Sequence, residues 1–260
     1  MRPLFRKFFG ENLKEYVFFQ PEFAMENYFS QVGTEPFDIA EFEEIVGDLS
    51  CVIVLFPEAA GSFAEAGYFS AIEPLAKKTL IALNIEFQAI DSFISMGPAK
   101  RFSELSVYRP EIQLDYSNPD FSIISDRIRR FNPVRKKKHF KTSTFAEMSS
   151  FDGLGLILKI VDILTIATID DIKFLLRSIF GGHISARAIT NLTSILVGGN
   201  FLTEVGEYGH YHVNEKTEPI FEVREGFKEQ QIEILLSFAE IQLNSDDEFQ
   251  KVIGEVQNVS

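Results

Sequence analysis

Apolar and polar positions in the first half of the chain follow a pattern that predicts helices placed between buried strands. Residues 50–56 form a continuous apolar run rich in β-branched side chains, which is typical of a central parallel strand covered on both faces. Residues 79–83 form a second such run, and residues 62–75 between them have helical spacing. A strand, a helix and a strand in this order predict a βαβ crossover. We therefore expect an α/β fold with a doubly wound parallel sheet.

Three segments before the first strand also have patterns that indicate secondary structure. Residues 3–13 have apolar side chains at helical spacing, which predicts a first helix, and residues 15–20 form a short β-prone run. Residues 38–47 are acidic with one apolar stripe, which predicts a helix that Asp38 caps and Gly47 ends.

The second half of the chain predicts an α+β domain of a different kind. Apolar positions at helical spacing alternate with cap and glycine signals and are followed by a hairpin signal, which is the order of elements in a winged helix. In chain order we expect a helix over 154–164, a helix that Thr168 caps and Gly181 ends, a helix that Ser185 opens and Gly198 ends, strands over 201–205 and 208–213, and a closing helix over 232–243.

Length and composition fit a soluble protein of two domains. The chain has 260 residues, of which 45% are hydrophobic and 24% charged, which excludes wholesale disorder. One cysteine excludes a disulfide framework and a cysteine-based zinc site. Early charged residues interrupt any secretory signal, and the longest apolar stretch is too short to cross a bilayer. We expect a cytoplasmic protein with no membrane contact.

The net charge of −13 is distributed unevenly. Residues 126–145 contain eight basic residues and one acid, whereas the segments on either side are both strongly acidic. This shift predicts domains over 1–145 and 146–260 with a basic linker at 127–145. Two interpretations remain open, a solvated linker or an electrostatic contact for nucleic acid or an acidic partner. The contact residues would be Arg135, Lys136, Lys137 and Lys138.

Candidate chemistry lies in the loop that follows the first strand. In open α/β sheets, ligands bind at the carboxyl ends of strands, where helix N-termini offer unpaired N–H groups. Gly61 would let the backbone approach a ligand, and the hydroxyl of Ser62 could bind a phosphate or ribose oxygen. The alternative is structural, because Ser62 and Glu65 have the spacing of a capping box.

The run IVLFPEAAGSFAEAGYFSA at 53–71 resembles the active-site strand, loop and helix of the nucleoside 2-deoxyribosyltransferase-like superfamily. Residues 83–98 resemble one branch of it, the bacterial retron-associated effector proteins, which add a C-terminal winged helix. The resemblance implies a deoxyribosyltransferase-like, flavodoxin-like fold for residues 1–145. That superfamily begins with an extra strand before the first helix. Here Met1 opens almost directly into the helix, so that strand is expected to be missing, and two explanations stay open: the start is truncated, or this member has a reduced pocket.

The resemblance also implies a set of site residues. Glu65 matches the nucleophilic glutamate, and Gly67 the glycine that packs the helix on the strand. Glu43 is the best match for a second catalytic carboxylate, with Glu41 and Glu44 as neighbours that could substitute. The substrate-binding positions implied are Gly61, Ser62, Glu58 and Asn84. Glu58 could instead act as the second acid, or be a solvated loop residue.

The chemistry that this set supports is cleavage of an N-glycosidic bond. A carboxylate stabilises the oxocarbenium-like state and can form a glycosyl-enzyme intermediate, while a second acid assists departure of the base. By resemblance, the chain would be a retron anti-phage defence effector, a toxin acting on a nucleotide or an NAD-like molecule. The retron reverse transcriptase and its msDNA would keep it in check. No cofactor or metal is expected, and an oligomer is possible.

Other functions stay open. The domain could be a catalytically inactive nucleotide-binding sensor or a protein-docking module. A transcriptional regulator is disfavoured, because the presumed recognition helix after Ser185 offers only Arg187 as a cation in an acidic domain. Cys51 is expected to be a small buried hydrophobe. His210 and His212 are expected on the surface of the hairpin rather than as metal ligands.

Overall fold

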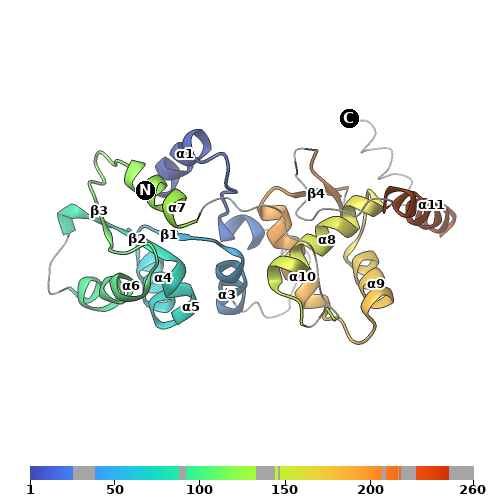
Figure 1. Cartoon of the computed structure of the whole chain (residues 1–260), viewed down its shortest axis with the longest axis horizontal. Coiled ribbons are helices and arrows are strands. Elements are labelled where there is room, and N and C mark those ends of the chain that lie inside the picture. The colour runs from blue at the N-terminus through green and yellow to red at the C-terminus, as the bar shows by residue number, and fades with distance from the viewer. Residues whose placement is uncertain are drawn as a thin grey trace. The chain divides into compact units, whose positions relative to one another are not determined.

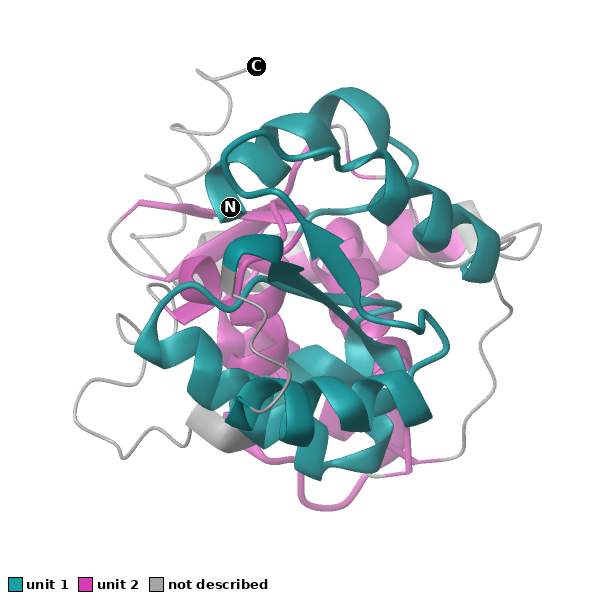
Figure 2. Cartoon of the chain, turned by 90° about the vertical axis from the view of Figure 1, so that its left-hand side faces the viewer, with its two compact units in different colours: residues 1–18, 38–135 teal, residues 19–37, 136–260 magenta. Residues whose placement is uncertain are grey.

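The structure is a computed structural model of the whole chain. The residues that it describes are 1–25, 39–87, 92–132, 144–145, 147–206, 209–215, 217 and 227–245. The chain divides into two compact units, coloured separately in Figure 2. The first comprises Met1–Phe18 and Asp38–Arg135, and the second comprises Phe19–Phe37 and Lys136–Ser260. The described residues 19–25 therefore belong with the C-terminal half, although they lie near the start of the sequence.

The first unit is an α/β structure with a small parallel sheet (Figure 1). Its strands run in the order β1-β2-β3, and both pairs are parallel. Its elements are α1 (Arg2–Asn12), α3 (Ile39–Leu49), β1 (Ile53–Leu55), α4 (Ala60–Ala71), α5 (Glu73–Lys78), β2 (Thr79–Asn84), η1 (Ile85–Phe87), η2 (Ser95–Ala99), α6 (Lys100–Leu105), β3 (Ile112–Leu114) and α7 (Ser122–Phe131).

The central strand is β2, not the strand that follows Ser50. Five of its six residues, Thr79 to Leu83, are buried, as expected for a strand with neighbours on both sides. The apolar run at 50–56 supplies only the three residues of β1, which pairs with β2 and lies at the edge of the described sheet. The β1-α4-α5-β2 connection confirms the predicted crossover. The expectation that 50–56 is central was wrong, because strand order depends on contacts between distant segments.

Both faces of this sheet are covered by helices. Leu80 and Ala82 of β2 belong to a core cluster with residues of α1 and α7, whereas Ile81 and Leu83 belong to a second cluster with residues of α4, α5 and α6. Successive residues of a strand point to opposite faces. The two clusters therefore lie on opposite sides of the sheet.

Phenylalanine rings hold α1 against the first unit. Phe5 is 3% exposed, and its ring centroid lies 5.3 Å from that of Phe121 and 5.4 Å from that of Phe56. Phe18 packs against Phe9 at 5.0 Å. The β-prone run at 15–20 forms no strand, so that prediction was wrong. Its aromatic side chains pack into the core instead of its backbone pairing with a neighbour.

Two predicted helix ends differ from the structure. Helix α3 continues through Gly47 to Leu49, and a Cβ at Gly47 would lie 2.3 Å from Cδ2 of Leu75. This glycine therefore permits close packing and does not end the helix. The helix expected over 62–75 is broken at Ile72, and Pro74 lies in the first turn of α5, where a missing N–H has no intrahelical partner to lose.

The second unit consists of helices and one antiparallel hairpin. Thr168 and Ser185 cap two of the helices with side-chain hydrogen bonds, as predicted, and the hairpin is confirmed. Cys51, which belongs to the first unit, was expected to be a small buried hydrophobe; that prediction was wrong, because Cys51 is exposed. The elements of the second unit are α8 (Ser150–Leu164), α9 (Ile169–Phe180), α10 (Ala186–Gly198), β4 (Leu202–Val205), β5 (His210–Val213) and α11 (Phe227–Ser245).

The middle of helix α10, the presumed recognition helix, is buried around its whole circumference. Eight consecutive residues, Ile189 to Leu196, are buried, and α10 packs against α8, α9 and β4. A Cβ at Gly198 would lie 2.7 Å from the backbone nitrogen of Ala24. His210 is 4% exposed, so the expectation of a surface histidine was wrong there. This middle part of α10 therefore has no exposed face for a DNA groove, whereas Ala186 and Arg187 in its first turn are exposed.

Candidate functional site

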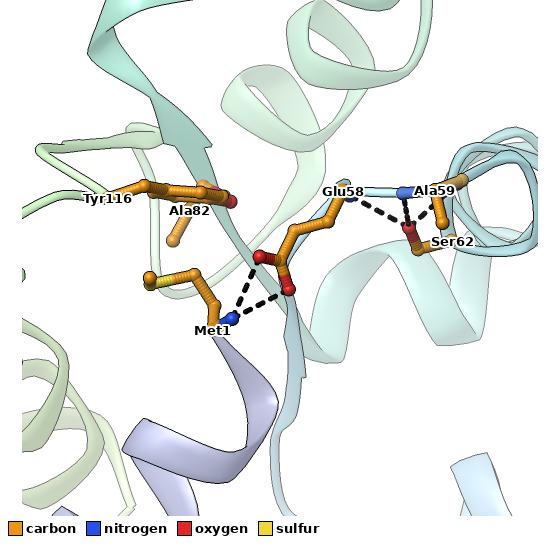
Figure 3. A network of polar contacts seen from close by, with 6 residues as sticks. All are labelled: Met1, Glu58, Ala59, Ser62, Ala82 and Tyr116. Atoms are coloured by element: carbon orange, nitrogen blue, oxygen red, sulfur yellow. Dashed lines mark hydrogen bonds and ion pairs between the residues drawn. The ribbon is translucent and has the colours of Figure 1, made fainter.

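The loop after β1 is held by the hydroxyl of Ser62 (Figure 3). Ser62 Oγ accepts hydrogen bonds from the backbone N–H groups of Glu58 at 2.9 Å and Ala59 at 3.0 Å, and donates to the carbonyl oxygen of Ala59 at 2.9 Å. Ala59 is the N-cap of α4, so Ser62 is the third helical residue. The capping box between Ser62 and Glu65 does not form.

Glu65 lies one turn further along α4, and its carboxylate takes no part in the hydrogen bonds that cap this helix. Its side chain is 33% exposed, and Oε2 accepts a hydrogen bond from Nη2 of Arg2 at 2.9 Å. The position of Arg2 is fixed because α1 is anchored through Phe5. This partner could not be predicted from sequence, since the two residues are 63 positions apart.

Glu58 is the second carboxylate of this loop. Both of its oxygens accept hydrogen bonds from the amino group of Met1 at 2.8 Å. Tyr116 lies nearby in Figure 3 and donates its hydroxyl to the carbonyl oxygen of Ala82 at 2.7 Å. Burial, and then the negative charge of Glu58, raise the pKa of Tyr116. Tyr116 therefore remains protonated, and its part in this site was not predicted.

Glu43 is half-buried on α3. Its neighbour Glu44 makes a contact between α3 and α4, since Oε1 of Glu44 accepts a hydrogen bond from the hydroxyl of Tyr68 at 3.1 Å. Tyr68 follows Glu65 by three positions on the same helix, so the two side chains lie on neighbouring parts of its surface. Glu43 remains a prediction.

Asn84 and the two glycines have different surroundings. Asn84 ends β2, and its Oδ1 accepts a hydrogen bond from the backbone N–H of Glu86 at 3.2 Å. Because β1 and β2 are parallel, Asn84 lies at the same sheet edge as the loop after β1. A Cβ at Gly61 or at Gly67 would meet nothing within 4 Å. Gly61 is exposed, with open space around this position, whereas the packing role expected for Gly67 is wrong.

The basic segment has two different parts. Arg135, Lys136, Lys137 and Lys138 lie outside the described residues. In α7, Arg127 donates to the carbonyl oxygen of Tyr108 at 2.8 Å, and Arg129 pairs with Glu15 at 2.8 Å. These two arginines therefore connect α7 to the rest of the first unit.

Among the residues that the structure describes, no group of three or more His, Cys, Asp or Glu side chains could hold a metal ion. No helix there is long and apolar enough to span a membrane.

The fold and this site define an α/β protein with a carboxylate-bearing helix at the carboxyl edge of a parallel sheet, joined to a mainly helical unit. Residues 1–204 match the family described as "STM3845 retron effector protein", and the chain belongs to that family. It is also similar to a curated Escherichia coli protein named "Retron Ec86 putative ribosyltransferase/DNA-binding protein". The two are 34% identical over 94 residues, which cover 35% of this chain and only 30% of that relative.

Proposed function

We propose that this retron effector cleaves the N-glycosidic bond of a nucleotide or an NAD-like molecule, with Glu65 as the nucleophile. The observation that carries the proposal is the state of the Glu65 carboxylate. It lies near the start of α4 at the carboxyl edge of the sheet, it is partly exposed, and it takes no part in capping the helix. The word "ribosyltransferase" in the relative's name is consistent with this chemistry.

In the proposed reaction, the bond between C1′ and the base nitrogen breaks, and its electron pair leaves with the base. The Glu65 carboxylate stabilises the cationic sugar and bonds to C1′, and water then hydrolyses that ester. Gly61 and Ser62 would lie against the sugar or its 5′-phosphate, with Asn84 on the neighbouring strand end.

A general acid must supply the proton that the departing base takes up. Glu43, or its neighbour Glu44, would act as this acid from α3. Glu58 lies in the loop after β1, but both of its oxygens accept hydrogen bonds from the amino group of Met1, which favours the ionised form. We therefore keep Glu43 as the proposed acid, with Glu58 as the alternative.

In its cellular setting, we propose that the activity serves anti-phage defence as a toxin. The retron reverse transcriptase and msDNA would hold the protein inactive until infection. Membership of a retron effector family supports a role within such a system.

The test is base release by the purified full-length protein. The protein is incubated with NAD or with nucleoside monophosphates, and free base is measured by liquid chromatography. Glu65→Gln keeps the size of the side chain but removes the nucleophile, so release should fall by at least about 100-fold while the circular dichroism spectrum is retained. Glu73→Gln is the matched control, since Glu73 pairs with Lys77 on α5 at 2.6 Å and lies outside the site. Equal activity of Glu65→Gln and the unmodified protein would refute the nucleophile.

One observation favours a second candidate function, a nucleotide-binding sensor without turnover. The carboxylate of Glu65 is paired with Arg2, and such a pair can serve recognition instead of attack. Calorimetry with the same nucleotides separates the two functions. Binding without any base release, at protein concentrations well above the dissociation constant, would support the sensor.

A further inference from the structure

Helix α11 has no buried side chain in its described part. The side chains that the structure describes there, over 229–238 and at Glu240, are all exposed or half-buried, whereas α8, α9 and α10 each bury apolar side chains. The main packing partner of α11 is α8, and α11 lies at the right-hand end of the second unit in Figure 1. Packing of an apolar face supplies most of the stability of a helix in a protein. The apolar side chains of α11 therefore have surface left to cover.

Two large apolar side chains lie on an outer side of this helix. Ile232 is 57% exposed and Leu236 is 64% exposed. They are four positions apart, so they are neighbours on the helix surface. Gln231, Leu235 and Phe238 are half-buried, and their spacing of four and then three positions places them together on another side of the helix. That side packs against the unit, which leaves Ile232 and Leu236 facing solvent.

Acidic side chains border these two apolar residues. Glu229, Glu233 and Glu240 are all exposed. Each of them lies three or four positions from Ile232 or from Leu236, so each is a neighbour of one of the two on the helix surface. The outer side of α11 therefore has an apolar stripe next to an anionic stripe.

The charge of this region determines which kind of partner fits it. From 229 to 250 the sequence has six acidic residues and no Lys, Arg or His. Nucleic acid and the surface of an anionic membrane carry the same sign of charge as these side chains, so both are repelled. A second copy of α11 laid against the first would place glutamates opposite glutamates, which costs free energy. A partner that has an apolar stripe beside cationic side chains matches both features of the face.

We propose that this face, defined as Glu229, Ile232, Glu233, Leu236 and Glu240, binds a basic amphipathic helix of a partner protein. The apolar stripe of the partner helix would cover Ile232 and Leu236, which is a common mode of helix recognition. Its Lys and Arg side chains would pair with the glutamates. In such a contact the buried apolar residues supply most of the affinity, and the charges set the orientation and speed of association. This inference does not depend on Glu65 or on glycosidic cleavage.

The test measures binding of a fluorescein-labelled synthetic peptide to the full chain by anisotropy, between about 50 and 200 mM salt. The peptide has about 18 residues and contains only leucine and lysine, placed so that the leucines form one face of a helix. Leu236→Gln keeps the helix propensity and should weaken binding by about 10- to 150-fold, as for the loss of one buried leucine side chain. Glu233→Gln should weaken binding by about 2- to 5-fold and reduce its salt dependence.

Matched controls lie elsewhere in the second unit. They are Ile179→Gln, where the side chain is 59% exposed on α9, and Glu215→Gln, where the side chain is exposed after β5. Both variants should bind the peptide within about twofold of the unmodified protein. A second peptide, with glutamate in place of every lysine, should not bind.

Three outcomes would overturn the proposal. The first is an affinity that Leu236→Gln and Glu233→Gln leave unchanged, or that the two controls reduce equally, because the net negative charge of the chain would then explain the binding. The second is equal binding of the glutamate peptide, since the charge of the partner would then not matter. The third is an oligomer of the unmodified protein, measured by light scattering, that Leu236→Gln converts to monomers, because a second copy of the chain would then occupy the face.

Discussion

Replacement of Ser62 by alanine tests how the loop after β1 is held. The hydroxyl accepts two backbone N–H groups and donates to one carbonyl oxygen. A hydrogen bond contributes about 0.5–1.5 kcal/mol net, so the two accepted bonds together contribute about 1–3 kcal/mol. Glu58 and Ala59 are exposed, and water can satisfy their N–H groups after the change. We therefore expect a loss of about 1–2 kcal/mol, which is in the range for removal of a helix cap.

The assay is urea unfolding followed by far-ultraviolet circular dichroism, because the chain has no tryptophan to report by fluorescence. Ser70→Ala is the matched control on the same helix. Ser70 Oγ only donates to the carbonyl oxygen of Gly67, at 2.8 Å, and its loss should cost less than about 0.5 kcal/mol. A Ser62→Ala protein as stable as Ser70→Ala would refute the reasoning, since the loop would then be held without the hydroxyl.

Two further predictions concern packing and pH. Gly47→Ala places a Cβ 2.3 Å from Leu75 Cδ2 and should lower the free energy of unfolding in urea by about 1–3 kcal/mol. Gly67→Ala has open space around it and should raise the free energy of unfolding by about 0.5–1 kcal/mol. If Gly67→Ala were the less stable of the two, the packing described here would be contradicted. Tyr108 donates its hydroxyl to the carbonyl oxygen of Cys51 at 2.8 Å, and burial raises its pKa. Its contribution to stability is therefore complete below the ordinary tyrosine pKa of about 10 and is lost as the pH rises above it, so the decline of urea midpoints from pH 9 to 12 should be shallower in Tyr108→Phe. An identical decline would show that Tyr108 does not titrate with unfolding.

Features that depend on neighbouring residues were predicted well from the sequence. The cap at Thr168 depends only on residues three positions apart: the Thr168 hydroxyl accepts a hydrogen bond from the backbone N–H of Asp171, and the Asp171 carboxylate accepts one from the backbone N–H of Thr168. The strand at 79–83 was also predicted, because a continuous run of apolar residues is typical of a strand that is buried on both faces. The Ser62 and Glu65 box did not form for a local reason: the helix begins at Ala60 with Ala59 as its N-cap, so Ser62 is not the capping residue.

Features that depend on distant residues were not predicted. The partner of Glu65 is Arg2, and Tyr116 reaches the loop from beyond β3. Nothing in either local sequence identifies these pairs, since packing of α1 and of the sheet brings them together. For the same reason, the identity of the central strand could not be read from apolar content, because both runs are apolar and only their neighbours in space differ.

The chain passes from one unit to the other three times, after Phe18, after Phe37 and after Arg135. No single cut in the gene would therefore release either unit whole, because a fragment that starts at α3 loses Phe5 and Leu13 from its core, and one that starts at α8 loses Ala24 from its contact with Gly198. Recombination at one crossover point could not transplant either half onto another protein.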